Sequence, residues 1–292
     1  MRVHHLDCAT MCPFGGRLLL GSGGPLVGRL SAHCLLIEGP TGLILVDTAF
    51  GTADVADPGR LGRQFLTMVR PRLDLAHTAL HRIRALGYRP EDVRDIVLTH
   101  LDLDHAGGIG DFPHARIHVL DEELRAARAR ATRGERDRYR PAQWAHNPRW
   151  VEHPLGGATE DWYGLPAVPI LPAGTPDLLL VPLPGHSRGH SGVAVRTAGR
   201  WLLHCGDAYF SHTDVAPGPV RRPPGLTAFQ RLVAIDNGAR RDTLERLREL
   251  RRTHADEVRL VCAHDPFDLA APGAPAGAAA TAAASAPLDP QP

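Results

Sequence analysis

Apolar residues occur along this chain in short runs separated by turns rich in glycine and proline. In the first half these runs predict β-strands over residues 2–5, 17–20, 33–38, 43–47, 95–99 and 116–120. In the second half they predict strands over residues 178–182, 192–196, 201–205 and 258–262. Pro40-Thr41-Gly42 predicts a hairpin turn between two of the early strands.

Helical spacing of apolar residues alternates with these strands. One face of residues 74–87 is apolar and predicts a helix that Gly87 ends. A second helix is expected after residue 120 with Asp121 as its N-cap, and a third over residues 227–253. Because the strands form two groups, each followed by helix, the pattern favours an α/β protein with two face-to-face sheets and outer helices.

The length of 292 residues allows one large domain or two small ones, and residues 1–270 are expected to form a single domain. Residues 121–177 fit the pattern least well, since they hold three of the four tryptophans and two of the four tyrosines. Such aromatic density in a proline- and glycine-rich stretch is typical of a packed insertion or of a pocket wall. Residues 271–292 are mostly alanine and proline and are expected to be a disordered tail.

Composition narrows the class of protein without deciding its function. The 292 residues are 43% hydrophobic and 22% charged, which is typical of a soluble globular protein. The formal net charge of +1 gives no reason to expect a nucleic-acid or membrane partner, and the expected partner is a small-molecule substrate. Five cysteines without zinc-knuckle spacing favour a reduced, cytoplasmic setting.

The chemistry is concentrated where the predicted strands end. The run His100-Leu101-Asp102-Leu103-Asp104-His105 follows one strand, and imidazoles and carboxylates are the side chains that bind zinc, iron or manganese. Further potential metal ligands follow other strands. They are Asp47, His186 and His190 in a glycine-rich turn, Asp207, and His264.

In these motifs the chain resembles the metallo-β-lactamase superfamily, over about residues 2–268. The family motif His-x-His-x-Asp-His corresponds here to residues 100–105. The resemblance is closest in motif order to the lactonase and glyoxalase-II-like branches. It implies an αββα sandwich of two mixed sheets with outer helices, and a binuclear metal site at one edge of the sheets.

The resemblance also implies a role for each residue. One metal ion would lie with His100, Asp102, His186 and Asp207, and the other with Asp104, His105, His264 and the shared Asp207. Asp47 and His190 would support these ligands without binding metal themselves. Asp104 would hold the attacking water and pass its proton to the leaving group.

Asp102 departs from the family motif, which has histidine there. A carboxylate makes the cluster less positive and favours harder metals, so zinc is expected first, with manganese or iron as alternatives. Two interpretations remain open. Asp102 either binds metal and tunes its identity, or is too short to reach and leaves one position weak.

Two residues are candidates for contact with the substrate. Tyr209 could donate a hydrogen bond to a developing oxyanion, although related lactonases carry their tyrosine one position later, at Phe210 here. Arg188 could bind a substrate carboxylate, or it could be an ordinary solvated arginine. Residues 51–73 are expected to form either a lid over an apolar substrate or a capping helix.

The predicted function is therefore metal-dependent hydrolysis of an ester, lactone or thioester by a metal-bound hydroxide. An iron-dependent oxidoreductase on the same fold is an alternative, because some members of the superfamily perform redox chemistry. A non-catalytic metal-binding relative is a second alternative.

Overall fold

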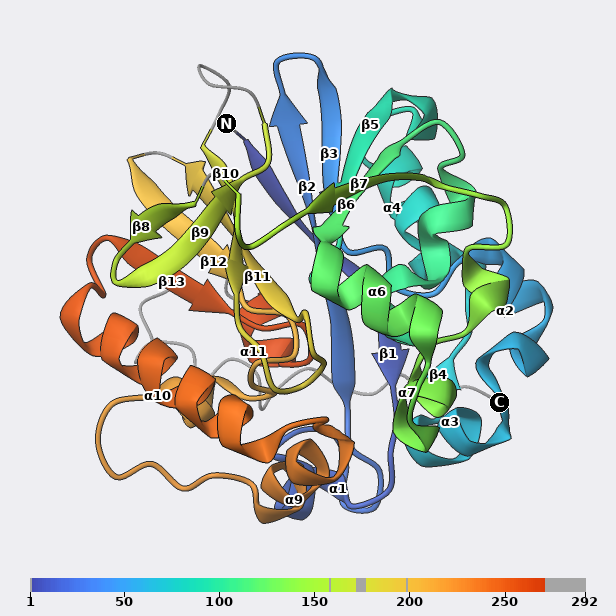
Figure 1. Cartoon of the computed structure of the whole chain (residues 1–292). Helices are drawn as coiled ribbons and strands as arrows, with labels where there is room; N and C mark the ends of the chain where they lie inside the picture. The colour runs from blue at the N-terminus through green and yellow to red at the C-terminus, as the bar shows by residue number, and fades with distance from the viewer. Residues whose placement is uncertain (1, 158, 172–176, 198, 271–292) are drawn as a thin grey trace.

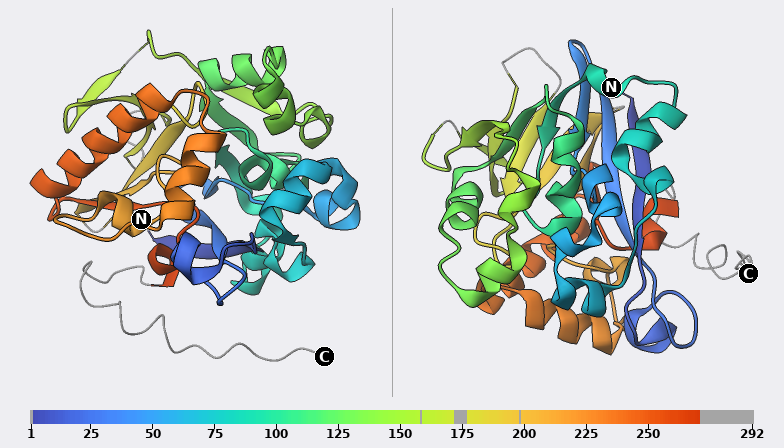
Figure 2. Two further views of the ribbon diagram at one scale, coloured as in Figure 1. Left: turned by 90° about the horizontal axis from the view of Figure 1, so that it is seen from below. Right: turned by 90° about the vertical axis from the view of Figure 1, so that its right-hand side faces the viewer.

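The computed structural model describes residues 2–157, 159–171, 177–197 and 199–270. Two β-sheets lie face to face and helices cover their outer sides, as Figures 1 and 2 show from three directions. This is the predicted αββα arrangement of two mixed sheets. The predicted tail, residues 271–292, lies outside the described residues.

The first sheet has seven strands and is antiparallel at one end and parallel at the other. The parallel strands bring several strand ends to one edge. In spatial order the strands are β4 (Pro71–Arg72), β1 (Val3–Met11), β2 (Leu30–Gly39), β3 (Gly42–Val46), β5 (Val93–Val97), β6 (Arg116–Leu120) and β7 (Arg149–His153).

The second sheet has six strands and is antiparallel except for the pairing of β12 with β13. In spatial order the strands are β13 (Val258–Val261), β12 (Arg200–His204), β11 (Ser191–Thr197), β10 (Leu178–Pro182), β9 (Leu165–Pro169) and β8 (Glu160–Trp162).

Short helices connect the strands and one long helix, α10, packs on β13 (Figure 1). Within the described residues, no helix is long and apolar enough to cross a membrane. The α-helices are α1 (Gly16–Leu20), α2 (Thr52–Ala56), α3 (Arg63–Val69), α4 (Ala79–Ala85), α5 (Leu103–Ala106), α6 (Asp121–Ala129), α7 (Arg133–Arg138), α8 (His212–Val215), α9 (Pro224–Val233), α10 (Asn237–Thr253) and α11 (Pro266–Ala270). The 3₁₀ turns are Pro58–Leu61, Leu75–His77, Pro90–Asp92, Gly107–Asp111 and Pro141–Gln143.

One predicted strand was wrong. Residues 17–20 form helix α1, not a strand. Leu18 is 71% exposed and Leu19 is 43% exposed, so this apolar run does not belong to a buried sheet. A run of three leucines fits a short helix as well as a strand, and the glycines on both sides, Gly16 and Gly21, adopt left-handed backbone angles that end strands.

Three predicted helix boundaries also differ from the structure. Residues 227–253 form two helices, because Asp236 accepts hydrogen bonds from two backbone N–H groups and starts α10 anew. Residues 74–87 divide into a 3₁₀ turn and α4, since Thr78 caps α4. Asp121 is the first residue of α6 rather than its N-cap, which is Leu120.

Strand β2 is buried on both faces, because the sheets pack on each other and on helices. Leu35 and Ile37 belong to the core between the two sheets. Cys34 and Leu36 point to the other side, into the core under the outer helices. This alternation explains why the strands read as continuous apolar runs, and why polar residues gather beyond their ends.

Candidate metal centre

The seven side chains predicted to bind metal lie together where strands of both sheets end. They form two clusters, and within each the potential ligand atoms lie within 4.8 Å of one another. The first cluster is His100, Asp102, His186 and Asp207, and the second is Asp104, His105 and His264. The side chains come from the segments that follow β5, β10, β12 and β13, with Asp104 and His105 on α5, so both sheets contribute.

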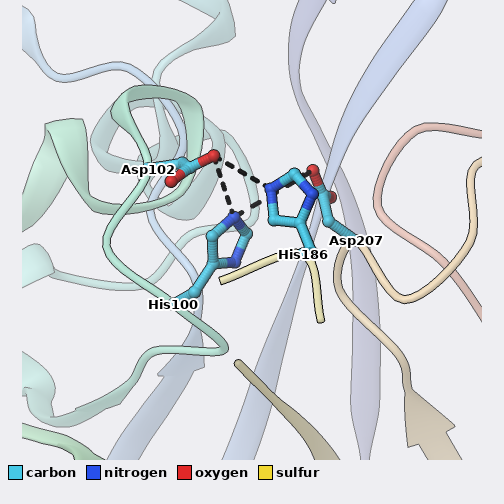
Figure 3. A group of neighbouring side chains, drawn as sticks. All are labelled: His100, Asp102, His186 and Asp207. Carbon is cyan, nitrogen blue, oxygen red and sulfur yellow. Dashed lines mark hydrogen bonds and ion pairs between the residues drawn. The ribbon is translucent and has the colours of Figure 1, made fainter. Parts of the chain in front are cut away.

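The spacing in the first cluster fits one metal ion (Figure 3). Oδ2 of Asp102 lies 3.4 Å from Nε2 of His100 and 3.0 Å from Nε2 of His186. Oδ2 of Asp207 lies 3.4 Å from the same His186 atom. Ligands at about 2.1 Å from a tetrahedral ion are about 3.4 Å apart. Asp102 is therefore long enough to reach the other ligand atoms.

Asp207 faces both clusters. Its Oδ1 lies 3.2 Å from Nε2 of His105 and 3.0 Å from Nε2 of His264, while its Oδ2 faces the first cluster. Oδ2 of Asp104 lies 3.6 Å from Nε2 of His264. The two oxygens of Asp207 thus lie where one carboxylate would bridge two metal ions.

Unpartnered buried atoms provide an independent test of whether the site fits metal ions. Nε2 of His100 and of His105, Oδ1 of Asp102 and Oδ1 of Asp207 are buried without a directed hydrogen bond among the described residues. Leaving such atoms unpartnered is costly, and these atoms of His100, His105 and Asp207 lie close to one another at the clusters, where a metal ion would bind them. A nitrogen and oxygen set of this kind fits divalent zinc, manganese or iron.

Neighbouring groups orient the histidines of the second cluster. Nδ1 of His105 lies 2.8 Å from Oδ2 of Asp47, which also binds Thr99 through both carboxylate oxygens. Nδ1 of His264 donates to the backbone carbonyl of Ser31 at 2.7 Å. With Nδ1 engaged, each ring presents Nε2 to the cluster. Asp47 lies where the resemblance placed it, behind a ligand.

His190 lies behind the first cluster and holds the backbone of Asp207. Its Nδ1 donates to the carbonyl of Leu183 at 2.8 Å, and its Nε2 accepts from the N–H of Asp207 at 2.9 Å. Both ring nitrogens are used in this way. Gly206, with φ of +50°, allows the close approach, because a Cβ there would lie 2.8 Å from Nε2 of His190.

Burial and charge set the protonation of the first cluster. Burial alone would raise the pKa of Asp102, but the Arg138 guanidinium and the His100 ring outweigh it and hold that pKa well below its usual range. The pKa of Asp207 is likewise held low against burial by His264 and other histidines. Burial, together with Arg138, lowers the pKa of His186 to about 4. Charged carboxylates and a neutral imidazole are the forms that bind metal.

Two residues at the site were missed by the sequence analysis, and the first is Arg138 on α7. Its Nη1 donates to Oδ2 of Asp102 at 2.6 Å. It lies in the segment 121–177, where the aromatic residues indicated a packed insertion or pocket wall. It ends a short polar helix whose residues show no distinctive spacing, so only the tertiary structure shows where its side chain points.

The second missed residue is Glu123 on α6, whose side chain is fully buried. Its Oε2 accepts hydrogen bonds from Oγ of Ser187 at 2.7 Å and from the N–H of Gly189 at 3.1 Å, just after His186. Its Oε1 accepts from the N–H of Leu101 at 3.0 Å. Glu123 therefore fastens two ligand-bearing turns to one helix. No motif in the sequence pointed to it.

The two predicted substrate contacts lie elsewhere. The structure does not bring Tyr209 to the clusters: its side chain is fully buried in the core under α10, among Cys205, Leu247 and Cys262. Arg188 is half-exposed, and its Nε donates to Oε1 of Glu135 at 2.7 Å.

Phe210 takes the position beside the site that was considered for Tyr209. The Phe210 ring centroid is 4.8 Å from that of His264 and 6.0 Å from that of His186. The residue one position after Tyr209 is therefore the one at the clusters.

An apolar pocket of about 500 Å³ opens beside both clusters. Asp102, Asp104, His186, Asp207 and His264 form its polar end. Most of its remaining wall is apolar and comes from β1, α1, α3, α9 and the loops beside them. Examples are Met11, Phe14, Leu20, Phe65, Met68 and Phe229. A ligand with a polar group at the clusters and an apolar chain fits this shape.

Several known proteins are similar to this chain in sequence. Residues 27–264 match the sequence profile of the metallo-beta-lactamase superfamily. The probable metallo-hydrolase Rv2300c of Mycobacterium tuberculosis is 45% identical over 266 residues, 91% of this chain and 81% of that protein. N-acyl homoserine lactonase AttM of Agrobacterium fabrum is 27% identical over 212 residues, 67% of this chain and 71% of that protein.

Solved structures share the fold at low sequence identity. A variant of AiiA from B. thuringiensis, with N-decanoyl-L-homoserine at its active site, has a TM-score of 0.65 and 20% identity over 90% of this chain and 93% of that one. AidC, a dizinc quorum-quenching lactonase, has a TM-score of 0.58 and 16% identity over 91% and 87%. Since the family profile spans every strand end that carries the two clusters, we conclude that this chain belongs to the metallo-beta-lactamase superfamily.

Proposed function

We propose that this protein is a metal-dependent hydrolase that opens a lactone carrying an apolar acyl chain, with esters and thioesters as alternative substrates. The observation that carries the proposal is the set of converging, unpartnered ligand atoms at the polar end of an apolar pocket. The mycobacterial metallo-hydrolase and the N-acyl homoserine lactonases among the similar proteins support it.

We propose two divalent metal ions in the two clusters, zinc first and manganese or iron as alternatives. AidC, which shares the fold, is a dizinc enzyme. The carboxylate at position 102 is the reason for the alternatives, since harder metals prefer oxygen ligands. When bound, such ions lower the pKa of water toward neutrality and polarise a carbonyl group.

Each side chain of the two clusters would then have its own role. Asp207 would hold both metal positions, and the histidines would fix them at the sheet edge. Asp104 is a member of the second cluster and is buried, at 8% exposure. Its carboxylate would accept the proton of the attacking water and return it to the leaving oxygen.

The apolar wall of the pocket would bind the acyl chain. Phe65, Met68 and Val69 of α3 line it, so the segment 51–73 contributes a wall of the pocket. Phe229 of α9 lies on the wall as well. Burial of a chain there would contribute about 0.8 kcal/mol for each methylene group.

The test is a substrate panel on protein of known metal content. Metal-free protein is reconstituted with zinc, manganese or iron and assayed on N-hexanoyl and N-decanoyl homoserine lactone, a thioester and a phosphodiester. We expect lactone hydrolysis that depends on metal, with the decanoyl substrate favoured in kcat/KM.

The His105→Ala variant should lose metal and activity together. The His114→Ala variant is the matched control, because His114 is exposed and belongs to neither cluster. Turnover of the phosphodiester alone, or turnover unaffected by metal removal, contradicts the proposal.

Iron-dependent redox chemistry is the second candidate, and one observation favours it. The first cluster combines two imidazoles with the Asp102 and Asp207 carboxylates, and mixed histidine and carboxylate ligands occur in non-haem iron centres. Oxygen uptake by anaerobically iron-loaded protein, without lactone hydrolysis, would establish this function instead.

A further inference from the structure

Arg138, the last residue of α7, extends its guanidinium group into the first cluster. Nη1 lies 2.6 Å from Oδ2 of Asp102 and 2.7 Å from Nε2 of His186. The second terminal nitrogen, Nη2, donates to the backbone carbonyl of Val233. Only 8% of the Arg138 side chain is exposed. The guanidinium group is thus fixed between a carboxylate, an imidazole and a carbonyl.

The contact with Arg138 occupies Nε2 of His186, which is also the atom that would bind a metal ion in the first cluster. Since Arg138 can only donate, Nε2 of His186 is the unprotonated nitrogen of the ring in this contact, and its one lone pair either accepts a hydrogen bond or binds a metal ion. A guanidinium group stays protonated in proteins and can only donate. Arg138 and a metal ion in the first cluster therefore compete for Nε2 of His186.

Asp102, the residue that departs from the family motif, explains how the Arg138 guanidinium group can be buried here. A buried guanidinium group is costly unless a carboxylate pairs with it, and Asp102 supplies that charge. With histidine at position 102, as in the family motif, Nη1 of Arg138 would face two imidazoles there. Asp102 and Arg138 are thus two halves of one ion pair.

The helix that carries Arg138 is anchored on both sides of it. Thr132 and Glu135 form a capping box at the start of α7. Tyr139, which directly follows Arg138, is fully buried and its hydroxyl donates to Glu123 at 3.0 Å. These contacts hold the guanidinium group at the cluster.

The second cluster is held by contacts of a different kind. Nε2 of His105 and of His264 face Asp207 at 3.2 and 3.0 Å. Their Nδ1 atoms bind the Asp47 carboxylate and the carbonyl of Ser31. Carboxylates and a backbone carbonyl, rather than a guanidinium group, order this cluster.

We propose that Arg138 is a built-in cation of the first cluster that competes with a metal ion for His186, so that the two metal positions fill in order. The second cluster, whose Asp104, His105 and His264 share Asp207 with the first cluster, fills first. The first cluster fills only when Arg138 releases His186. This inference rests on the metal binding in the proposed function, and it adds the order of loading.

The experiment is a zinc titration of the metal-free full chain. Calorimetry measures the binding steps, and metal analysis after dialysis measures the zinc that stays bound. The parent should bind one zinc ion tightly and a second at least about tenfold more weakly, which a difference of about 1.4 kcal/mol produces. The His264→Ala variant should lose the tight step, and the His100→Ala variant should lose the weak step.

The decisive variant is Arg138→Met, which removes the guanidinium group. The weak step should tighten by about tenfold or more while the tight step changes little, since a charge-assisted hydrogen bond of this kind is lost. Arg133→Met is the matched control: it removes one arginine from the same helix, 89% exposed, and should leave both steps unchanged.

Arg138→Gln is a second variant, in case Arg138→Met does not fold, because its amide keeps a donor for Val233. It should tighten the weak step as well. Two equal steps in the parent, or a weak step that neither folded variant tightens, would overturn the inference and leave the proposed hydrolase intact. A parent that binds neither zinc nor manganese nor iron would overturn both.

Discussion

The Glu123 carboxylate accepts a hydrogen bond from the N–H of Leu101, the residue between His100 and Asp102, at 3.0 Å. The same carboxylate binds Ser187, the residue after His186. A helix outside the motifs therefore connects the two turns that build the first cluster, and its side chain touches neither ligand directly.

Glu123→Gln should weaken both the fold and the metal site. Four donors converge on the Glu123 carboxylate, and the amide NH₂ of glutamine would face two of them. We expect the free energy of unfolding to fall by roughly 2–4 kcal/mol, because buried donors lose their acceptors. Urea unfolding measures this change, and a zinc titration should show weaker binding.

Two controls separate positioning from general destabilisation. Glu122→Gln changes the neighbouring residue of α6 and should leave both measurements unchanged. Leu247→Ala, in the core under α10, should lower stability by a comparable amount without altering zinc affinity. If Leu247→Ala weakens zinc binding as much as Glu123→Gln does, Glu123 has no specific positioning role.

Asp102→His should shift the metal preference toward zinc. The change replaces a hard oxygen ligand by an imidazole and removes the carboxylate that pairs with Arg138. Protein purified from medium containing zinc, manganese and iron is analysed for metal content. We expect a higher share of zinc than in the parent, and identical content in the two proteins would show that Asp102 does not tune the metal.

Tyr209→Phe should leave hydrolysis almost unchanged. The Tyr209 side chain lies in the core under α10, while Phe210 lines the pocket. We expect kcat to stay within about twofold of the parent, since an oxyanion donor would contribute about a hundredfold or more. Phe210→Ala is the companion variant and should raise KM for long acyl chains. A large loss of kcat in Tyr209→Phe would restore the tyrosine as a catalytic candidate.

The metal-free fold should lose stability between pH 6.5 and 4 through His5. Burial and nearby positive groups lower the pKa of His5 from 6.5 to about 4, and its Nδ1 lies 2.7 Å from Nε2 of His33. Within this range the unfolded chain binds more protons than the folded one, so the free energy of unfolding rises with pH. The share of His5 is at most about 3 kcal/mol, at 1.36 kcal/mol for each pKa unit.

Urea unfolding in the presence of a chelator, at pH 7 and pH 4.5, measures this effect. His5→Gln should reduce the pH dependence relative to the parent. The comparison between the two proteins is needed because the pKa of His105 and of His264 is raised by nearby carboxylates, against the effect of burial, and these residues act in the opposite direction. Equal pH dependence in both proteins would exclude a contribution from His5.

The strand ends and their ligands could be predicted from the sequence because both signals are local. An apolar run ends, and Asp47, Asp207 or His264 follows within a few residues. Parallel and antiparallel pairing then brings these ends to one edge, and the sandwich follows from two groups of such strands. The ligand sets implied by the family motif are also the sets that the structure brings together.

Arg138 and Glu123 could not be predicted, because nothing local distinguishes them. Each lies on a short, highly charged helix with many similar side chains, and its role depends on where tertiary packing places that helix. The direction of Tyr209 was unpredictable for a related reason. A shift of one residue after Asp207 decides whether a side chain enters the pocket or the core.

The centre draws its side chains from two separate stretches of the chain. Asp47 and residues 100–105 belong to the half that forms the first sheet, while His186, Asp207 and His264 belong to the half that forms the second. Neither half, expressed as a separate fragment, would carry a complete cluster that includes Asp207. Recovery of zinc binding on mixing such fragments would therefore report their reassembly. The bound ions would link the two halves, because each half supplies part of their ligands.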